Sequence, residues 1–101
     1  MLFVYMTFPT EEEARKVGKK IAEEGLARCV NIIPGMESLF IWKGMMRNEK
    51  ECIIIAKTAE RNYAKLESRV KQLHSYEMPC IIAFKVSKGS KEFIRWVDSK
   101  E

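Results

Sequence analysis

The sequence has few of the residues on which catalytic centres and metal sites are usually built. His74 is the only histidine among 101 residues, so a Ser-His-Asp or Cys-His arrangement could form only around it. The five glycines are scattered and form no phosphate-binding loop, and neither a G-x-S-x-G nor an H-E-x-x-H motif occurs. We therefore expect a protein that is not an enzyme and requires no cofactor.

Cysteine is scarce as well. Cys29, Cys52 and Cys80 lie far apart in apolar stretches, and no C-x-x-C pair occurs. This odd, dispersed set argues against a disulfide framework or a structural zinc site and favours a reducing compartment. The N-terminal stretch MLFVYMTFPT has neither a basic leader nor an apolar run long enough to span a membrane. We expect a cytoplasmic protein that does not contact a membrane.

Long blocks of one charge are also absent. The chain has 18 lysines and arginines against 14 aspartates and glutamates, and the two signs alternate along it. The formal net charge of +4 is therefore typical of a solvated surface and gives no argument for nucleic-acid binding. With 47% hydrophobic residues, the chain suits one compact domain, which we place at residues 1–101.

The first half of the chain alternates between strand and helix signals. Leu2–Phe8 is a nearly continuous apolar run, typical of a central strand buried on both faces. Thr10 begins a capping-box pattern, and apolar residues at helical spacing predict a helix over residues 11–24. Residues 27–42 are rich in β-formers, but Pro34–Gly35 interrupts them and indicates a bulge or an edge position.

The second half continues with the same kinds of signal. In chain order we expect a hairpin turn at 43–50, a buried strand at Cys52–Ala56 continuing to Thr58, a helix at 60–73, a strand at 80–86 and a helix at 91–99. The order β-α-β-β-α-β with right-handed crossovers predicts an α+β, ferredoxin-like sandwich. In it, four antiparallel strands carry two helices on one face, and a C-terminal helix is added.

Two other classes of protein with this fold do not match. RNA-recognition domains stack bases on aromatic side chains of a central strand, whereas the corresponding stretch KECIIIAKT (50–58) has no aromatic residue. Acylphosphatases bind phosphate after the first strand, where this chain has FPTEEE (8–13) and would repel it. We expect no nucleic-acid partner.

The stretch LHSYEMPCII (73–82) gathers the residues best suited to binding a soft metal ion. Imidazole, thiolate and thioether are ligands that copper prefers. His74 and Cys80 are six residues apart across a turn, and Met6 ends a strand that could lie nearby. The alternative is structural: Cys80 as a small buried hydrophobe, His74 at a helix terminus, and Tyr76 shaping the turn.

A second cluster is apolar. Residues 39–42 form the uninterrupted run Leu-Phe-Ile-Trp, and Met45 and Met46 follow shortly after. A hairpin that reaches solvent should alternate between apolar and polar residues, so this run favours a surface covered by another subunit. In the alternative, the C-terminal helix and Trp96 cover the second face of the sheet.

Several motifs resemble those of the CutA family, the divalent cation tolerance group. The matching stretches run over nearly the whole chain: VYMTFP (4–9), LARCVNIIPGMESLFIWKG (26–44), KT (57–58), LHSYEMPCI (73–81) and the F-x-x-W of residues 93–96. The resemblance implies a ferredoxin-like fold and a tight homotrimer in which long hairpin strands pair across subunits. It also implies an architecture similar to the PII signalling trimers, whose intersubunit clefts bind small effectors, and a link to copper tolerance.

The chain departs from the family pattern at two positions. Cys80 stands where the family usually has a carboxylate after the proline, and Met6 stands where some members have cysteine. If these positions hold metal, His74, Cys80 and Met6 with help from Glu77 form a softer set that favours copper.

Two alternatives stay open. In one, the protein is a PII-like trimer that binds a small ligand through Trp42, Lys57, Tyr76 and Glu77. In the other, it is a structural scaffold for another protein.

Overall fold

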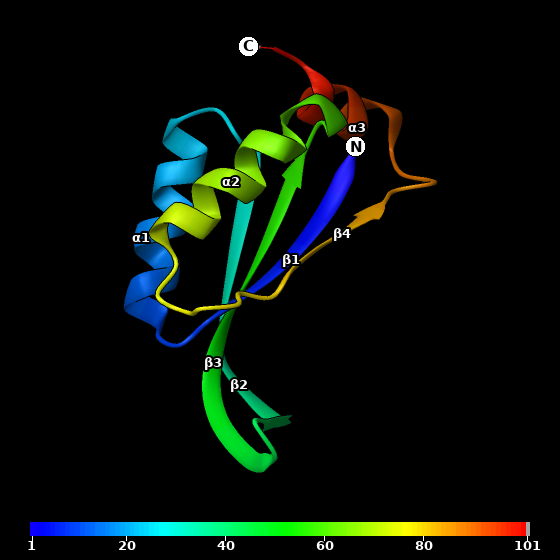
Figure 1. The fold of residues 1–101 in the computed structure, drawn as a ribbon. Coiled ribbons are helices and arrows are strands. Elements are labelled where there is room, and N and C mark those ends of the chain that lie inside the picture. The colour runs from blue at the N-terminus through cyan, green and yellow to red at the C-terminus, as the bar shows by residue number, and fades with distance from the viewer. Residues whose placement is uncertain (101) are drawn as a thin grey trace.

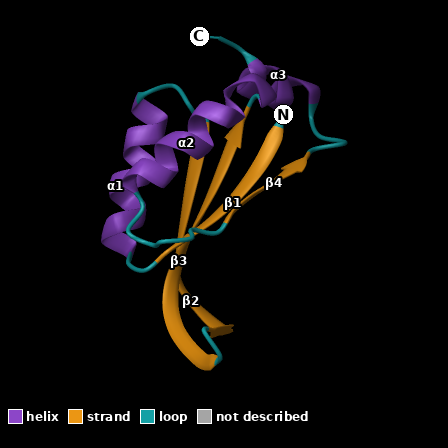
Figure 2. Cartoon of the chain, in the orientation of Figure 1, coloured by secondary structure: helices purple, strands orange, loops and turns teal. Residues whose placement is uncertain are grey.

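The computed structural model describes residues 1–100 as a four-stranded antiparallel sheet with two helices on one face and a third helix at one end (Figures 1 and 2). The sheet order is β2-β3-β1-β4. The elements, in chain order, are β1 (Leu2–Phe8), α1 (Glu11–Glu23), β2 (Cys29–Trp42), β3 (Met45–Thr58), a 3₁₀ turn (Glu60–Asn62), α2 (Tyr63–Leu73), β4 (Ile81–Lys85) and α3 (Lys91–Asp98). The predicted ferredoxin-like α+β fold is confirmed.

The core lies between the sheet and the two long helices. Alternate side chains of a strand point to opposite faces, and in β1 the buried set is Leu2, Val4, Met6 and Phe8. These side chains pack with the apolar faces of α1 and α2, which lie side by side over the sheet (Figure 2). The central position of β1 is confirmed, but its second face is only partly buried, because Thr7 is buried whereas Phe3 and Tyr5 are half-buried.

The start of α1 connects the core to the loop after α2. Thr10 is the N-cap, and its hydroxyl accepts a hydrogen bond from the Glu13 amide at 3.1 Å, as the capping pattern predicts. The Glu13 carboxylate accepts a hydrogen bond from the Ser75 amide at 3.1 Å. The N-terminal turn of α1 thereby anchors the segment that leads into β4.

The hairpin of β2 and β3 is much longer than the sheet it belongs to. The register shifts between Ile33 and Met36, so Pro34–Gly35 forms the expected irregularity, on an edge strand. Pairing of β3 with β1 ends at Cys52, and the two hairpin strands continue together as a projecting arm, residues 36–51 (Figure 1).

The tip of the arm corrects the expected turn at 43–50. Only Lys43 and Gly44 form the turn, with φ of 52° and 79°, which suits a two-residue hairpin connection. Residues 45–50 belong to β3 and pair with β2. The polar residues that suggested a loop are exposed positions of a two-stranded ribbon.

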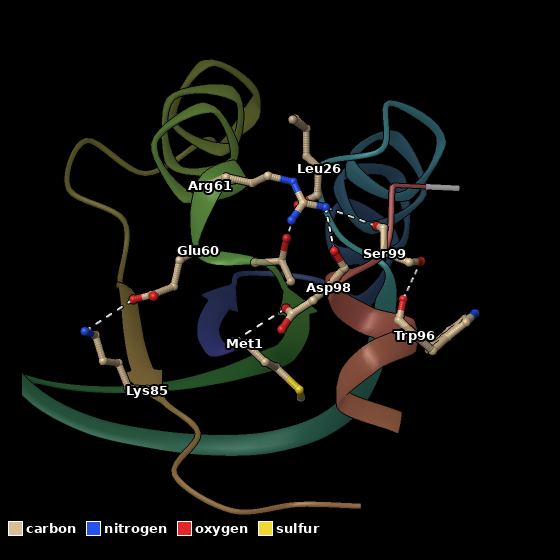
Figure 3. Close-up of polar contacts among 9 residues, drawn as sticks. Met1, Leu26, Glu60, Arg61, Lys85, Trp96, Asp98 and Ser99 are labelled. Atoms are coloured by element: carbon tan, nitrogen blue, oxygen red, sulfur yellow. Dashed lines mark hydrogen bonds and ion pairs between the residues drawn. The ribbon is translucent and has the colours of Figure 1, made fainter. Parts of the chain in front are cut away.

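The helix α3 is held at the end of the sheet where β1 begins (Figure 3). The guanidinium of Arg61 donates hydrogen bonds to the carbonyl oxygens of Asp98 and Ser99, at 2.8 and 3.1 Å. This position leaves the second face of the sheet open, since Ile82 and Phe84 remain 47% and 54% exposed. α3 therefore reaches only the end of that face, where the Lys57 ammonium lies 5.6 Å from the centre of the Phe93 ring, and does not cover the β4 side.

The core makes a direct prediction about stability. Leu66→Ala should lower the free energy of unfolding by about 2–5 kcal/mol, because the Leu66 side chain lies fully buried on the core-facing side of α2 and its truncation leaves a cavity. The exposed neighbour gives a matched control, and Lys65→Ala should change the value by less than about 0.5 kcal/mol. Denaturant unfolding measures both. Equal effects of the two substitutions would contradict the assignment of this helix face to the core.

Candidate functional site

A cleft of about 520 Å³ lies between the arm and the segment that connects α2 to β4. The arm contributes aromatic and charged side chains, and the connecting segment contributes residues between 75 and 80. Thr7 comes from the end of β1, and Pro9 follows that strand. These three parts of the chain are far apart in sequence. The cleft exists because the arm projects beyond the core on the side where β1 ends.

The arm side of the cleft follows from strand alternation. In the register of the hairpin, Phe40 lies opposite Arg47 and Trp42 lies opposite Met45. Side chains of Phe40, Trp42, Arg47, Glu49 and Glu51 line the cleft, as expected of alternate residues on one face of a ribbon. The Arg47 guanidinium lies 3.1 Å from a carboxylate oxygen of Glu49.

The opposite wall is fixed by His74, whose side chain is fully buried. Its Nε2 lies 2.7 Å from the carbonyl oxygen of Thr7, and because a carbonyl only accepts, Nε2 must donate. Nδ1 then accepts a hydrogen bond from the Tyr76 amide at 3.0 Å, which defines the neutral Nε2–H tautomer. The ring also stacks on Phe8 with centroids 4.5 Å apart. His74 therefore holds the connecting segment against β1.

Glu51 and Tyr76 join the two walls. The Tyr76 hydroxyl donates a hydrogen bond of 2.8 Å to a carboxylate oxygen of Glu51, which is only 8% exposed. Burial, and then this hydrogen bond to a negative group, raise the pKa of Tyr76 far above its usual value. No lysine, arginine or histidine within residues 1–100 forms an ion pair with Glu51.

The negative charge of Glu51 also affects the thiol of Cys80. Although Cys80 is exposed at its outer side, partial burial raises the pKa of its thiol, Glu51 raises it further, and a hydrogen bond to the side chain of Thr7 acts in the opposite direction. For Tyr5, burial again raises the pKa, with smaller contributions from Cys80 and Glu51. In all three groups burial is the largest cause of the raised pKa, and the charge of Glu51 adds to it.

The structure brings together only some of the residues singled out from the sequence. Trp42, Tyr76, Glu77 and Cys80 line the same cleft. Lys57 does not: its ammonium lies 2.8 Å from the Asn31 side chain, in the part of β3 that pairs with the start of β2. Within one chain the strand therefore carries Lys57 away from Trp42 and Tyr76, and their grouping in a cleft between subunits stays a prediction.

The expected metal set is not assembled in this conformation. Both ring nitrogens of His74 are engaged in hydrogen bonds, and Met6 is fully buried on the helix-covered face of β1. Cys80 is exposed beside the cleft. Within residues 1–100, no cluster of three or more His, Cys, Asp or Glu side chains is placed to hold a metal ion. The set of His74, Cys80 and Met6 thus does not fit a metal centre.

Sequence reasoning did not identify the residues that give the cleft its charge and much of its apolar wall. These are Phe40, Arg47, Glu49, Glu51 and Met78. The signal was present in the period-2 alternation of β2 and β3, but it can be interpreted only once the turn is known to be two residues long. Glu51 also has a signal of its own in the sequence, because an acidic residue directly before the buried strand CIIIA (52–56) is a candidate for a buried charge.

The fold and the cleft together define a ferredoxin-like α+β protein with a small-molecule-sized, acidic cleft beside an extended hairpin. Comparison with known proteins agrees with this class. The model of the family CutA1 divalent ion tolerance protein matches residues 2–100. The chain therefore belongs to the CutA1 divalent ion tolerance protein family.

Individual relatives are similar over most of their length. The divalent-cation tolerance protein CutA of Thermus thermophilus is 40% identical over 93% of this chain and 91% of its own. The protein of that name from Archaeoglobus fulgidus is 42% identical over 95% and 93%. The solved structure of the Thermus protein superposes with a TM-score of 0.93 at 39% identity, covering 97% and 96%, and CutA1 of Oryza sativa gives 0.93 at 33%, covering 99% and 94%. None of these names is that of an enzyme.

The helices and the names of relatives bear on location. No helix in residues 1–100 has the length and apolar content needed to cross a membrane. Among the relatives, the Arabidopsis thaliana protein is named chloroplastic and the Archaeoglobus fulgidus structure is described as periplasmic. The expected cytoplasmic location therefore stays a prediction.

The electrostatics of the cleft predict how fast Cys80 reacts with iodoacetamide. Glu51→Gln removes a negative charge that raises the pKa of the Cys80 thiol, so the thiolate fraction at any pH below that pKa should increase. Alkylation of Cys80, followed by mass spectrometry of its peptide, should become faster in the variant. The exposed Glu12→Gln is the control and should leave the rate unchanged. An unchanged or slower rate in Glu51→Gln would contradict the proximity of the two groups.

Proposed function

We propose that the protein contributes to divalent-cation tolerance as a homotrimer that binds a positively charged ligand in the cleft and catalyses no reaction. The observation that carries the proposal is the Glu51 carboxylate, buried beside Tyr76 with a neutral partner and no ion pair within residues 1–100. A buried charge is costly unless it is paired. A cation that enters the cleft supplies the missing charge. We place this function in the cytoplasm.

The trimer is supported by apolar surface that this single chain leaves exposed. On the arm, Leu39, Ile41 and Met46 are each about two-thirds exposed, at 65%, 68% and 67%. A two-stranded ribbon is marginally stable alone, and an exposed apolar patch of this kind marks an interaction surface. The family resemblance supplies the expected occupant, which is the hairpin or sheet edge of another copy.

A second candidate ligand is copper itself. Met78 and Cys80 both line the cleft and offer a thioether and a thiol, which suit copper(I). This version of the metal hypothesis keeps Cys80 but replaces His74 and Met6, because those two side chains are used in the core. A PII-like effector role uses the same cleft and differs only in the ligand.

The charge of Glu51 gives a test that needs no ligand. Glu51→Gln retains an oxygen that can accept the Tyr76 hydrogen bond and removes the unpaired charge, so the free protein should become more stable by about 1 kcal/mol. Denaturant unfolding in ligand-free buffer measures the change, with Glu12→Gln as the control. A loss of stability would mean that the carboxylate already has a cationic partner in the assembled protein, and the proposal would then fail.

The assembly makes a separate prediction. Light scattering should give three times the chain mass of 11.8 kDa, and Leu39→Glu combined with Ile41→Glu should give a smaller species, because two charges then enter the apolar contact. Lys16→Glu, on the exposed face of α1, should leave the mass unchanged. A monomeric wild-type protein would instead favour the scaffold alternative, in which this surface binds a different protein.

A further inference from the structure

We propose that the cation bound by the cleft is a small organic ammonium ion with an apolar body. The inference rests on the proposed function, since it requires that the cleft binds a cation, and it goes further by naming the chemical class. Three properties of the cleft carry it: its size, its aromatic walls and its charge.

The size of the cleft suits an organic molecule. Its volume of about 520 Å³ lies within the range of about 300–1,000 Å³ typical of small-molecule sites. A bare metal ion would occupy a minor part of this space and would leave the apolar walls in contact with water.

Aromatic side chains face the cleft from both walls. Phe40 and Trp42 come from the arm, and Tyr76 comes from the connecting segment. The face of an aromatic ring attracts an ammonium or quaternary ammonium group, and sites that bind such groups are commonly built from several rings. Tyr76 is held in place before binding by its hydrogen bond to Glu51 and by the contact of its amide with His74, so little order is lost when a ligand enters.

The charge of the cleft has the sign that an ammonium ion requires. Glu49, Glu51 and Glu77 line it against one lining cation, Arg47, and the Lys43 ammonium lies 5.8 Å from the centre of the Trp42 ring. Arg47 is already paired with Glu49 at 3.1 Å, which leaves the carboxylates of Glu51 and Glu77 without an ion pair within residues 1–100. The cleft is therefore acidic on a protein whose formal net charge is +4. Burial is the main cause of the raised pKa values of Tyr76 and Cys80, and the negative charge of Glu51 raises both pKa values further.

The same geometry is poorly suited to a metal ion. Within residues 1–100, no three acidic, cysteine or histidine side chains are placed to hold one metal ion. One carboxylate oxygen of Glu51 already accepts a hydrogen bond from Tyr76. A divalent ion needs several ligands at fixed distances. An ammonium group needs only a nearby negative charge and aromatic faces, and the cleft supplies both.

The test compares two probes of nearly the same shape, choline and its uncharged isostere 3,3-dimethylbutan-1-ol. Calorimetric titration of the assembled wild-type protein should show choline binding at least about tenfold more tightly than the isostere, a difference of 1.4 kcal/mol. Copper(I) chloride and zinc chloride are titrated in parallel under reducing conditions.

Four variants locate the site. Glu51→Gln should weaken choline binding at least about tenfold, and Trp42→Leu about three- to thirtyfold through the lost cation–π contact. Tyr76→Phe keeps the carboxylate and an aromatic ring but removes the hydroxyl that holds them together, so it should weaken choline binding about threefold, less than Glu51→Gln does. Glu12→Gln, on α1 and outside the cleft, should change nothing. Circular dichroism and light scattering confirm that each variant keeps the fold and mass of the wild type.

The outcomes distinguish a failure of this inference from a failure of the proposed function. Choline binding that depends on Glu51 and on the positive charge supports the inference. Metal binding that depends on Glu51, without choline binding, overturns the inference and leaves the proposed function standing. If neither probe class binds, or if Glu51→Gln binds choline as well as wild type does, the inference is overturned. If neither choline nor the metal ions bind, the proposed function fails as well.

Discussion

The hydrogen bond from His74 to the carbonyl of Thr7 is the contact on which the candidate site depends. It lies between the end of a core strand and the start of the segment that connects α2 to β4. Because this bond fixes the Nε2–H tautomer, Nδ1 can accept a hydrogen bond from the backbone amide of Tyr76. This second bond positions the backbone from which the Tyr76 side chain extends. Stacking on Phe8 couples the ring to the core. The only histidine of the chain thus positions the site and need not touch the ligand.

From this contact the structure builds outward to the arm. Tyr76 reaches across to Glu51 at the base of the arm, where the hairpin leaves the sheet. Glu51 lies one residue before Cys52, the last residue of β3 that pairs with β1. The hydrogen bond between them closes the base of the cleft. Beyond it the two walls diverge, and the aromatic and acidic side chains of the arm face the connecting segment. The hydrogen bond between Tyr76 and Glu51 therefore sets both the position of the buried carboxylate and the shape of the opening of the cleft.

Most of the fold could be predicted from local patterns, and most of the site could not. The apolar run of β1, the cap at Thr10 and the interruption at Pro34–Gly35 are short-range signals, and each appears in the structure where the sequence places it. The prediction failed at the hairpin. Residues 45–50 have the composition of a loop, and only their cross-strand pairing with β2 makes them a strand.

The site residues depend on contacts between distant segments. Trp42, Tyr76, Glu77 and Cys80 could be selected from their motifs, whereas Glu51 acquires its role only through burial beside Tyr76, 25 residues away. His74 illustrates the opposite error. A single histidine six residues from a cysteine has the composition of a metal site, yet both of its ring nitrogens form hydrogen bonds with backbone groups. Sequence spacing cannot distinguish these cases, since both depend on which groups the fold brings within hydrogen-bonding distance.

The most direct measurement of the central claim is a crystal structure of the assembled protein at a resolution that defines the side chains around Glu51. The account predicts that the Glu51 carboxylate accepts the Tyr76 hydroxyl and has no lysine or arginine of any subunit within about 4 Å, the usual limit for an ion pair. A lysine or arginine of a neighbouring copy seated on Glu51 would contradict it. The carboxylate would then be a structural contact of the assembly, and the cleft would have no unpaired charge to offer a ligand.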